Sequence, residues 1–408
     1  MSALPFEPFV ALRFLREGRA QTLLIFVGVG VGIGVMVFLS ALISGLQGSL
    51  IKNTLSTQAH VVVRAPERTP TVLHDAAGAL VGAAVEKGAE RVARIDAWQP
   101  ISDTIAKLAT VTAVAPTVAG SAFAHQGPLT ASIALRGIDV ASYRRVVNLE
   151  EKLTSGRSDL VGNSALIGIE LANNLSLHVG DRLRLRTTAN REDIVRVSGI
   201  FDLGNKDVNQ RWVFVSLREA QSLLDLSGSV STFEVRIEDP FAAEAVAENI
   251  RQHTTLVAEP WTQLNRQLLV ALKSQSSSSI MIQVFVVLAV ALGIASVLVV
   301  SVVQKSKEIG ILRATGTSVR SITWIFLIQG LVVGLVGAVV GSLLGALLAF
   351  VFSRMAVSAD GSPTFPVDLG PDLFLRAFLV AIGVGLAAAI SPARRAARLD
   401  PAVAIRHV

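Results

Sequence analysis

Residues 321–353 read SITWIFLIQGLVVGLVGAVVGSLLGALLAFVFS and contain no Asp, Glu, Lys or Arg. Three further stretches of the 408-residue chain lack these residue types, at 20–51, 274–304 and 377–393. A helix needs roughly 20 apolar residues to cross the hydrocarbon core of a bilayer. The fourth stretch approaches that length across Arg376, whose long side chain can reach the membrane surface. The sequence therefore predicts four membrane-spanning helices and excludes a simple soluble enzyme.

The predicted spans are 22–46, 280–304, 321–353 and 373–390, and Pro392 is expected to end the last helix. A serine run, Ser276–Ser279, precedes the second span. Because residues 261–273 look helical, we expect this run to belong to a helix that continues into the membrane rather than to a linker.

Basic residues are distributed unevenly between the short segments. The segment before the first span holds three Lys or Arg, residues 305–320 hold four and the tail holds four, eleven in all, against two in the loop 354–376. Short cytoplasmic segments carry such an excess. We therefore predict that 1–21, 305–320 and 391–408 are cytoplasmic, and that 47–275 and the short loop 354–372 are external. The segment 47–275 holds 24 basic and 24 acidic residues, so the pI near 10.0 gives no reason to expect nucleic acid.

The long external segment has the mixed pattern of an α+β domain. Leu183 and Leu185 alternate with arginines, which predicts a half-buried strand, and 194–201 is its expected hairpin partner. The middle, about 120–225, is mostly strand, and the flanks carry helix–strand pairs. The fold class is thus a four-helix membrane protein with a large external α+β domain between helices 1 and 2.

Glycines recur at spacings of three and four in two of the spans. In the first span their context is a charge-free helix and not the strand–turn–helix of a dinucleotide site. Small residues at this spacing let helix backbones approach closely in a membrane. The glycines predicted to pack helices are Gly28, Gly32, Gly330, Gly334, Gly337, Gly341 and Gly345.

The chain offers no constellation for catalysis. It has no cysteine, and none of its six histidines pair at the i+3 or i+4 spacing of a metal motif. The region nearest to a phosphate loop, 156–163, lacks the Gly-Lys-Ser/Thr ending. No ionisable residue lies inside the three long spans, which argues against a proton or ion relay. We expect no catalytic, metal-binding or cofactor-binding residues.

The short segment 305–316 predicts an amphipathic helix between two spans. Glu308 and Leu312 share one face, Ile309 and Arg313 lie beside it, and Gly316 is expected to stop the helix. Such a segment suits a motor protein that pushes on the spans, although a tight connecting loop would have the same length. The basic tail, residues 391–406, is the second short segment that suits a functional role. It could instead serve only as a positive-inside anchor.

At these residues the chain resembles a known family. KEIGILRATG at 307–316, SPARRAARLDPAVAIR at 391–406 and ALRFLREGRAQTLL at 11–24 are similar to segments of the FtsX/MacB superfamily of ABC transporter permeases. Within it, LSGSVSTFEVRIEDPFAAEAV at 226–246 is most similar to the lipoprotein-releasing LolC/LolE permeases. The resemblance covers the whole chain.

The resemblance implies a bacterial inner-membrane subunit with a MacB-like porter subdomain and a strand-rich subdomain outside. Two copies of a separate ATPase, which bind ATP and Mg, would drive a pair of permeases that is either a homodimer or a heterodimer. The substrate, a lipoprotein or other amphiphile, would sit in a cavity of the first two spans, for which Met36, Phe38 and Leu42 are candidates. The coupling residues would be Lys307, Glu308, Ile309, Leu312, Arg313, Ala314 and Gly316.

One departure from the LolC pattern concerns the partner outside the membrane. LolC-type proteins carry a long hairpin that recruits a periplasmic carrier, but the connection here is only about residues 189–193, too short for such a hook. The sequence therefore does not decide whether the external domain binds a periplasmic carrier or an adaptor. Two alternatives remain: a MacB-type tripartite efflux permease, and an FtsX-like signalling permease that activates a cell-wall hydrolase and moves no substrate.

Overall fold

The structure, a computed structural model, describes residues 6–17, 19–66, 93–355 and 367–399, without the side chains of residues 19 and 20. The predicted segments 1–21, 354–372 and 391–408 therefore lie partly outside the described residues. The chain forms two compact units, one of Met1–Leu50 with Val270–Val408 and one of Ile51–Leu269.

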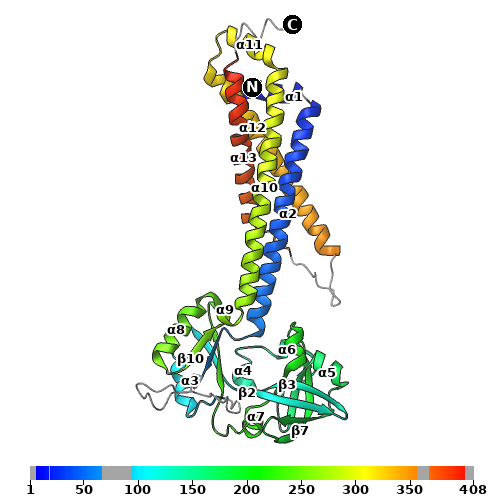
Figure 1. Cartoon of the computed structure of the whole chain (residues 1–408), viewed down its shortest axis with the longest axis vertical. Helices are drawn as coiled ribbons and strands as arrows, with labels where there is room; N and C mark the ends of the chain where they lie inside the picture. The colour runs from blue at the N-terminus through cyan, green and yellow to red at the C-terminus, as the bar shows by residue number, and fades with distance from the viewer. Residues whose placement is uncertain (1–5, 18, 67–92, 356–366, 400–408) are drawn as a thin grey trace, which may run out of the picture. The chain divides into compact units, whose positions relative to one another are not determined.

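The first unit consists of helices (Figure 1). Among the described residues, four helices are long and apolar enough to cross a membrane, and two short ones, α1 and α11, accompany them. The helices are α1 (Phe6–Glu17), α2 (Arg19–Thr57), α10 (Arg266–Gln304), α11 (Ser306–Ala314), α12 (Val319–Met355) and α13 (Pro371–Ala397). Because α10 begins at Arg266, the serine run is helical, and the prediction that it continues into the second span is confirmed.

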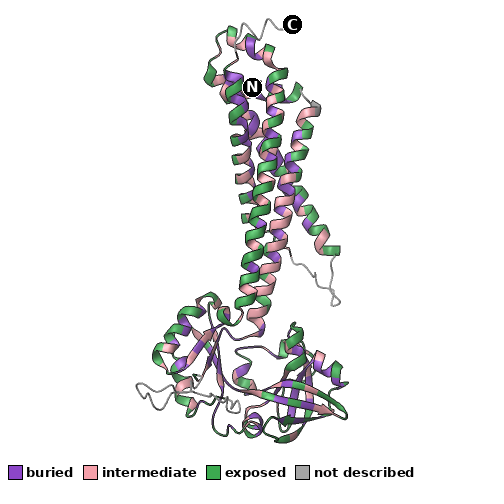
Figure 2. Cartoon of the chain, in the orientation of Figure 1, coloured by how far each residue is buried: buried purple, intermediate pink, exposed green. Residues whose placement is uncertain are grey.

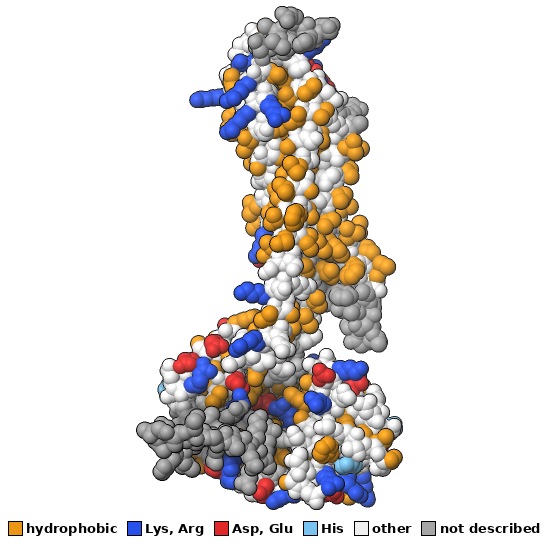
Figure 3. Space-filling view, in the orientation of Figure 1, with side chains coloured by type: hydrophobic (Ala, Val, Ile, Leu, Met, Phe, Trp, Pro, Cys, Tyr) orange, Lys and Arg blue, Asp and Glu red, His pale blue; other side chains and the backbone are white. Residues whose placement is uncertain are grey.

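The core of this unit is built at helical spacing. Val29, Ile33 and Val37 of α2 are buried, as are Val290, Ile294 and Leu298 of α10, so each helix contributes one residue per turn. Figure 2 shows that buried and exposed positions alternate along the long helices. The outward side chains are apolar as well (Figure 3), with Leu24 72% and Phe285 66% exposed. An apolar outer surface of this extent suits lipid or a partner helix, because water would leave it unstable.

The α12 glycines divide their contacts between two neighbours. Gly330 and Gly334 face α13, and a Cβ on Gly334 would lie 2.6 Å from the Ala381 carbonyl oxygen. The other three glycines, Gly337, Gly341 and Gly345, face α2, and a Cβ on Gly341 would lie 2.7 Å from the Gly30 carbonyl oxygen. Any side chain at these positions would push the helices apart.

The glycines of α2 divide differently. Gly32 packs closely against Val290 of α10, but a Cβ on Gly28 would meet nothing within 4 Å. The packing role predicted for Gly28 is therefore wrong within this chain. Its neighbour Gly30 packs instead, since a Cβ there would lie 2.9 Å from a methyl carbon of Val340. The GxxxG spacing shows that two glycines lie on the same helix face. Where two such pairs overlap, it does not show which pair meets the neighbouring helix.

Pro392 does not end the last helix, contrary to the prediction. α13 continues through it to Ala397. An internal proline removes one backbone hydrogen bond and costs about 3 kcal/mol in an isolated helix. Ala393, Ala396 and Ala397, all beyond the proline, are buried in one cluster with residues of α1 and α12. This packing offsets the loss and keeps the chain helical.

The second unit contains a small open sheet at one side. Its strand order is β10 (Val257–Pro260), β1 (Val61–Arg64), β9 (Thr232–Ile237) and the first part of β2 (Val111–Gln126). All three pairings are antiparallel. The helical elements near these strands are α3 (Trp98–Ala106), η2 (Pro240–Ala242), α8 (Ala243–His253) and α9 (Trp261–Leu264).

The second part of β2 belongs to a closed ring of six strands. The ring runs from β2 through β3 (Leu129–Ile138), β8 (Trp212–Ser216), β5 (Ser164–Gly168), β7 (Glu192–Phe201) and β6 (Arg182–Thr187) back to β2. The remaining elements are α4 (Val140–Tyr143), η1 (Glu150–Lys152), β4 (Leu153–Gly156), α5 (Ile169–Leu175), α6 (Lys206–Arg211) and α7 (Leu217–Leu223). β6 and β7 form the predicted hairpin.

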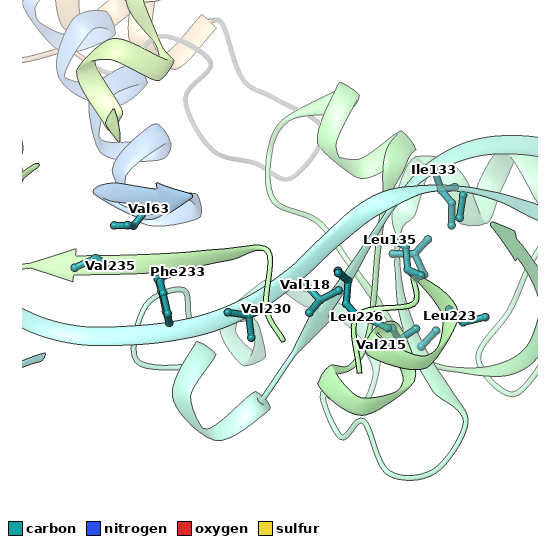
Figure 4. Packing of buried hydrophobic residues seen from close by; sticks show 14 of the residues in the cluster. Val63, Val118, Ile133, Leu135, Val215, Leu223, Leu226, Val230, Phe233 and Val235 are labelled. Carbon is teal, nitrogen blue, oxygen red and sulfur yellow. The ribbon is translucent and has the colours of Figure 1, made fainter. Parts of the chain in front are cut away.

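One apolar cluster joins the open sheet to the ring. It holds Val63, Phe233 and Val235 from the sheet together with Val118 and Leu135 from the ring (Figure 4). Because β2 belongs to both the open sheet and the ring, its buried residues contribute to both parts of this core.

Candidate functional site

The best-defined candidate site lies around α11, between the second and third long helices. Lys305 separates α11 from α10. At the other end Gly316 adopts a φ of +99°, which glycine reaches without strain. The Gly316 N–H donates to the Arg313 carbonyl and the Thr317 N–H to the Leu312 carbonyl, at 3.1 and 3.0 Å. These two hydrogen bonds end the helix, so the prediction of a short helix stopped by Gly316 is confirmed.

A serine caps the start of the next helix. The Ser318 hydroxyl accepts from the Ser321 N–H at 3.1 Å, at the beginning of α12. Only Thr317 and Ser318 therefore lie between the glycine and α12. The connection is too short to absorb much displacement, so α11 and α12 are tightly linked.

The two faces of α11 differ from the predicted arrangement. Ile309 is fully buried, and Leu312 packs partly against the same cluster. Ile309 therefore cannot touch a partner protein, and its predicted role as an ATPase contact is wrong. Ile309 is buried because it packs against a distant segment of the chain: apolar residues of α1, such as Val10 and Phe14, share that cluster.

The exposed face of α11 carries a residue that the sequence reasoning missed. Ile311 is 54% exposed, with Lys307 and Ala314 exposed one turn before and after it. These three residues are spaced at i, i+4 and i+7, so they form one surface. We call it the α11 outer face. The usable signal was the second isoleucine of the Glu-Ile-Gly-Ile sequence, which no internal packing requires.

Charged side chains connect α11 to α1. Arg13 donates to Glu17 at 2.8 Å within α1, and Lys305 pairs with both Glu17 and Glu308, the latter at 2.7 Å. Hydrogen bonds from Arg13 and Lys305 lower the pKa of Glu17, and the bond to Glu17 raises the pKa of Lys305. Glu308 was predicted as a contact for a partner; its side chain is 45% exposed and already paired within the chain.

Arg313 and the candidate cavity residues have less defined surroundings. The Arg313 Nε is buried without a hydrogen-bond partner among the described residues. Phe38 packs edge-on against Phe352 of α12, with ring centroids 5.8 Å apart. Met36 and Leu42 are half-buried on α2. Phe38 thus contacts a neighbouring helix, and a role of these three residues in binding substrate stays a prediction.

The second unit holds a pocket of about 620 Å³ with a mixed polar and apolar lining, between β3, α5 and α6. Asn174, Asp207 and Arg211 line it, and none of them has a side-chain partner among the described residues. The sequence reasoning did not single out these residues, because they come from three separate segments.

Comparison with known proteins agrees with this architecture. The family model of the MacB-like periplasmic core domain matches residues 22–253, more than half of the chain, and that of the FtsX-like permease C-terminal region matches 280–401. The lipoprotein-releasing system transmembrane protein LolC of Xylella fastidiosa (strain Temecula1) is 24% identical over 99% of both chains. LolC of Neisseria meningitidis serogroup B is 24% identical over 73% of this chain and 78% of its own length.

Two further similarities are partial. The macrolide export protein MacB of Azoarcus is 35% identical over 28% of this chain and 16% of its own length. The crystal structure of the periplasmic region of MacB from Actinobacillus actinomycetemcomitans covers 53% of this chain and 94% of that chain, at 13% identity and a TM-score of 0.34. The two family models together account for both the helical unit and the external unit, and the chain therefore belongs to the ABC transporter permeases of the FtsX/MacB type.

Proposed function

We propose that this permease couples ATP hydrolysis by a separate ATPase subunit to the extraction of a lipoprotein, or another amphiphile, from the inner membrane. Two ATPase copies that bind ATP and Mg, and a second permease subunit, complete the assembly. The proposed substrate class rests on the LolC relatives, whose name describes a lipoprotein-releasing system and which match nearly the whole chain. This chain itself supplies binding surfaces and mechanical connection, not chemistry.

The observation that carries the proposal is the α11 outer face. An apolar side chain that is 54% exposed on a nine-residue helix gains nothing from water. Its position between Lys307 and Ala314 suits an apolar pocket with a polar rim on a partner, the usual anatomy of a protein interface. The buried side of the same helix, with Ile309, packs against α1, α12 and α13. A partner that moves the outer face would displace α12 in particular, because a short connection joins it to α11.

The test is the exchange Ile311→Glu, compared with the conservative Ile311→Leu. We expect Ile311→Glu to lose the copurifying ATPase at least tenfold, because a carboxylate would have to enter the apolar contact. Ile311→Leu should retain the ATPase. Both variants should reach the membrane in equal amounts, since Ile311 is not part of the buried cluster. Full ATPase binding by Ile311→Glu would contradict the proposal.

The same purification distinguishes the other functions of this family. Release of a fluorescent acylated lipoprotein from proteoliposomes, dependent on ATP, is the expected result for the proposed function. An adaptor protein in the complex without lipoprotein release would indicate efflux, and a cell-wall hydrolase would indicate signalling. The short β6–β7 connection, residues 188–191, leads us to expect no carrier recruitment through that hairpin.

A further inference from the structure

Four charges of alternating sign run from α1 to α11. Arg13 and Glu17 lie on α1, Lys305 lies between α10 and α11, and Glu308 lies on the first turn of α11. The Lys305 ammonium group is shared by two carboxylates, and it also lies 5.6 Å from the centre of the Phe14 ring. We call this arrangement the charge clamp.

The clamp is not an ordinary surface ion pair. The Lys305 side chain is only 19% exposed, less than that of Glu17 at 36% or Glu308 at 45%. Its ammonium lies at the edge of a buried cluster, beside Phe14. Isolated exposed pairs contribute little, but pairs that are partly removed from water and joined in a network are stronger and more directional. The raised pKa of Lys305 is consistent with this arrangement.

Backbone continuity gives α11 only two neighbours. It is joined to α10 through Lys305 and to α12 through the short Gly316–Ser318 connection. α1 has no such link, because it precedes α2 in the chain. Its other contact with α11 is apolar, through Val10, Ala11 and Phe14 in the cluster that holds Ile309. Apolar contacts are not directional and permit sliding, whereas an ammonium bonded to two carboxylates fixes the relative position.

We propose that Lys305 is a positioning residue that holds α1 to the joint between α10 and α11, so that displacement of α11 is also carried into the N-terminal helix and the first span. The inference rests on the proposed function, since an ATPase must supply the displacement. The α11 outer face would receive the force, and the charge clamp would distribute it. α13 shares the apolar cluster but has no ion pair to α11 among the described residues.

The experiment measures whether α1 and α10 stay together when the ATPase closes. The chain has no cysteine, so nitroxide labels can be placed on Leu12→Cys and Val303→Cys, which are 40% and 68% exposed. Their separation is recorded by electron paramagnetic resonance in the complex with the copurified ATPase, without nucleotide and after vanadate trapping. A pair on Ile390→Cys and Val303→Cys, which joins α13 to α10, serves as the control.

The wild-type labels on α1 and α10 should give a narrow distribution of separations in both states. Lys305→Met should at least double its width after trapping, Glu17→Gln should have the same effect, and Lys305→Arg should restore the narrow distribution. The control pair should be equally wide in all of these proteins. A narrow distribution in Lys305→Met, or a widening that Lys305→Arg does not reverse, would overturn the inference.

ATPase binding separates this outcome from failure of the proposed function. Lys305→Met leaves Ile311 and Lys307 in place, so the ATPase should copurify and hydrolyse ATP within twofold of the wild type. If the wild type binds no ATPase, the proposed function itself fails. If Lys305→Met binds the ATPase and keeps α1 fixed, only the charge clamp fails.

Discussion

Ile309 and Ile311 stand two positions apart and have opposite surroundings. Ile309 is fully buried and Ile311 is 54% exposed. The sequence predicted the helix, its glycine stop and its amphipathic nature, because these depend on neighbouring residues. It did not predict which isoleucine faces inward, because that depends on α1 and on the alanines at the end of α13, which are distant in the chain. A nine-residue helix with apolar residues on two faces leaves this choice to its tertiary contacts.

Glu219 in the second unit is a residue-level feature with a measurable consequence. Its two carboxylate oxygens are buried without a hydrogen-bond partner among the described residues. Burial, aided by the nearby charge of Asp193, raises its pKa from 4.5 to about 7. Between these pH values the folded protein therefore holds a proton that the unfolded chain releases. The contribution of Glu219 to the free energy of unfolding falls as pH rises from 4.5 to about 7 and is constant above that.

Glu219→Gln should remove this pH dependence. At pH 8 the variant should be more stable than the wild type by roughly 2 to 3 kcal/mol, because the buried charge is gone. At pH 4.5, where the wild-type carboxyl is protonated, the two proteins should be similar. Thermal unfolding of the full chain in detergent, followed by tryptophan fluorescence, measures both. An equal difference at the two pH values would show that Glu219 does not titrate in this way.

At the scale of elements, glycine spacing and charge-free length predicted the helical unit well, since both are properties of single helices. The β6–β7 hairpin was also predictable, because its strands are adjacent in the chain and alternate clearly, with Leu183 and Leu185 buried between exposed arginines. The ring closure was not predictable. It depends on pairing of Ala122–His125 with Arg184–Thr187, which no local pattern specifies.

Gly341→Ala should loosen the contact between α12 and α2. The new Cβ would lie 2.6 Å from the Ile33 Cβ and 2.7 Å from the Gly30 carbonyl oxygen, so the helices must separate. We expect a loss of about 1–3 kcal/mol, seen as a lower melting temperature in detergent. Gly383→Ala on α13 is the matched control, because a Cβ there meets nothing within 4 Å. It should leave the melting temperature unchanged or raise it, since alanine favours helix; equal losses in both variants would contradict the packing argument.

At the scale of the whole molecule, the boundary between the two family models does not coincide with that between the two compact units. The MacB-like model, at 22–253, includes the first long helix, which belongs to the helical unit, whereas the FtsX-like model, at 280–401, lies entirely in that unit. The distribution of basic residues predicts an orientation, with both termini and α11 on the cytoplasmic side. An ATPase in the cytoplasm can reach the α11 outer face only in this orientation. The proposed function therefore requires that the predicted orientation is correct.

Single cysteines test the orientation directly. Ser132→Cys on β3 and Val319→Cys at the start of α12 are both exposed positions in a chain that has no other cysteine. A maleimide that cannot cross the membrane should label residue 132 in intact spheroplasts and residue 319 only after permeabilisation. Labelling in the reverse order would invert the topology and exclude cytoplasmic docking at α11.

The open sheet of the second unit also sets the order in which that unit is completed during export. β1 lies next to β9 and β10, with Val61 opposite Val235 on one side and Pro260 on the other. In the predicted topology this unit crosses the membrane as it is synthesised, so β1 would arrive first and both of its partners last. Until then its unpaired edges are open to wrong association. We therefore expect the second unit to be most prone to wrong association between the arrival of β1 and that of β9 and β10.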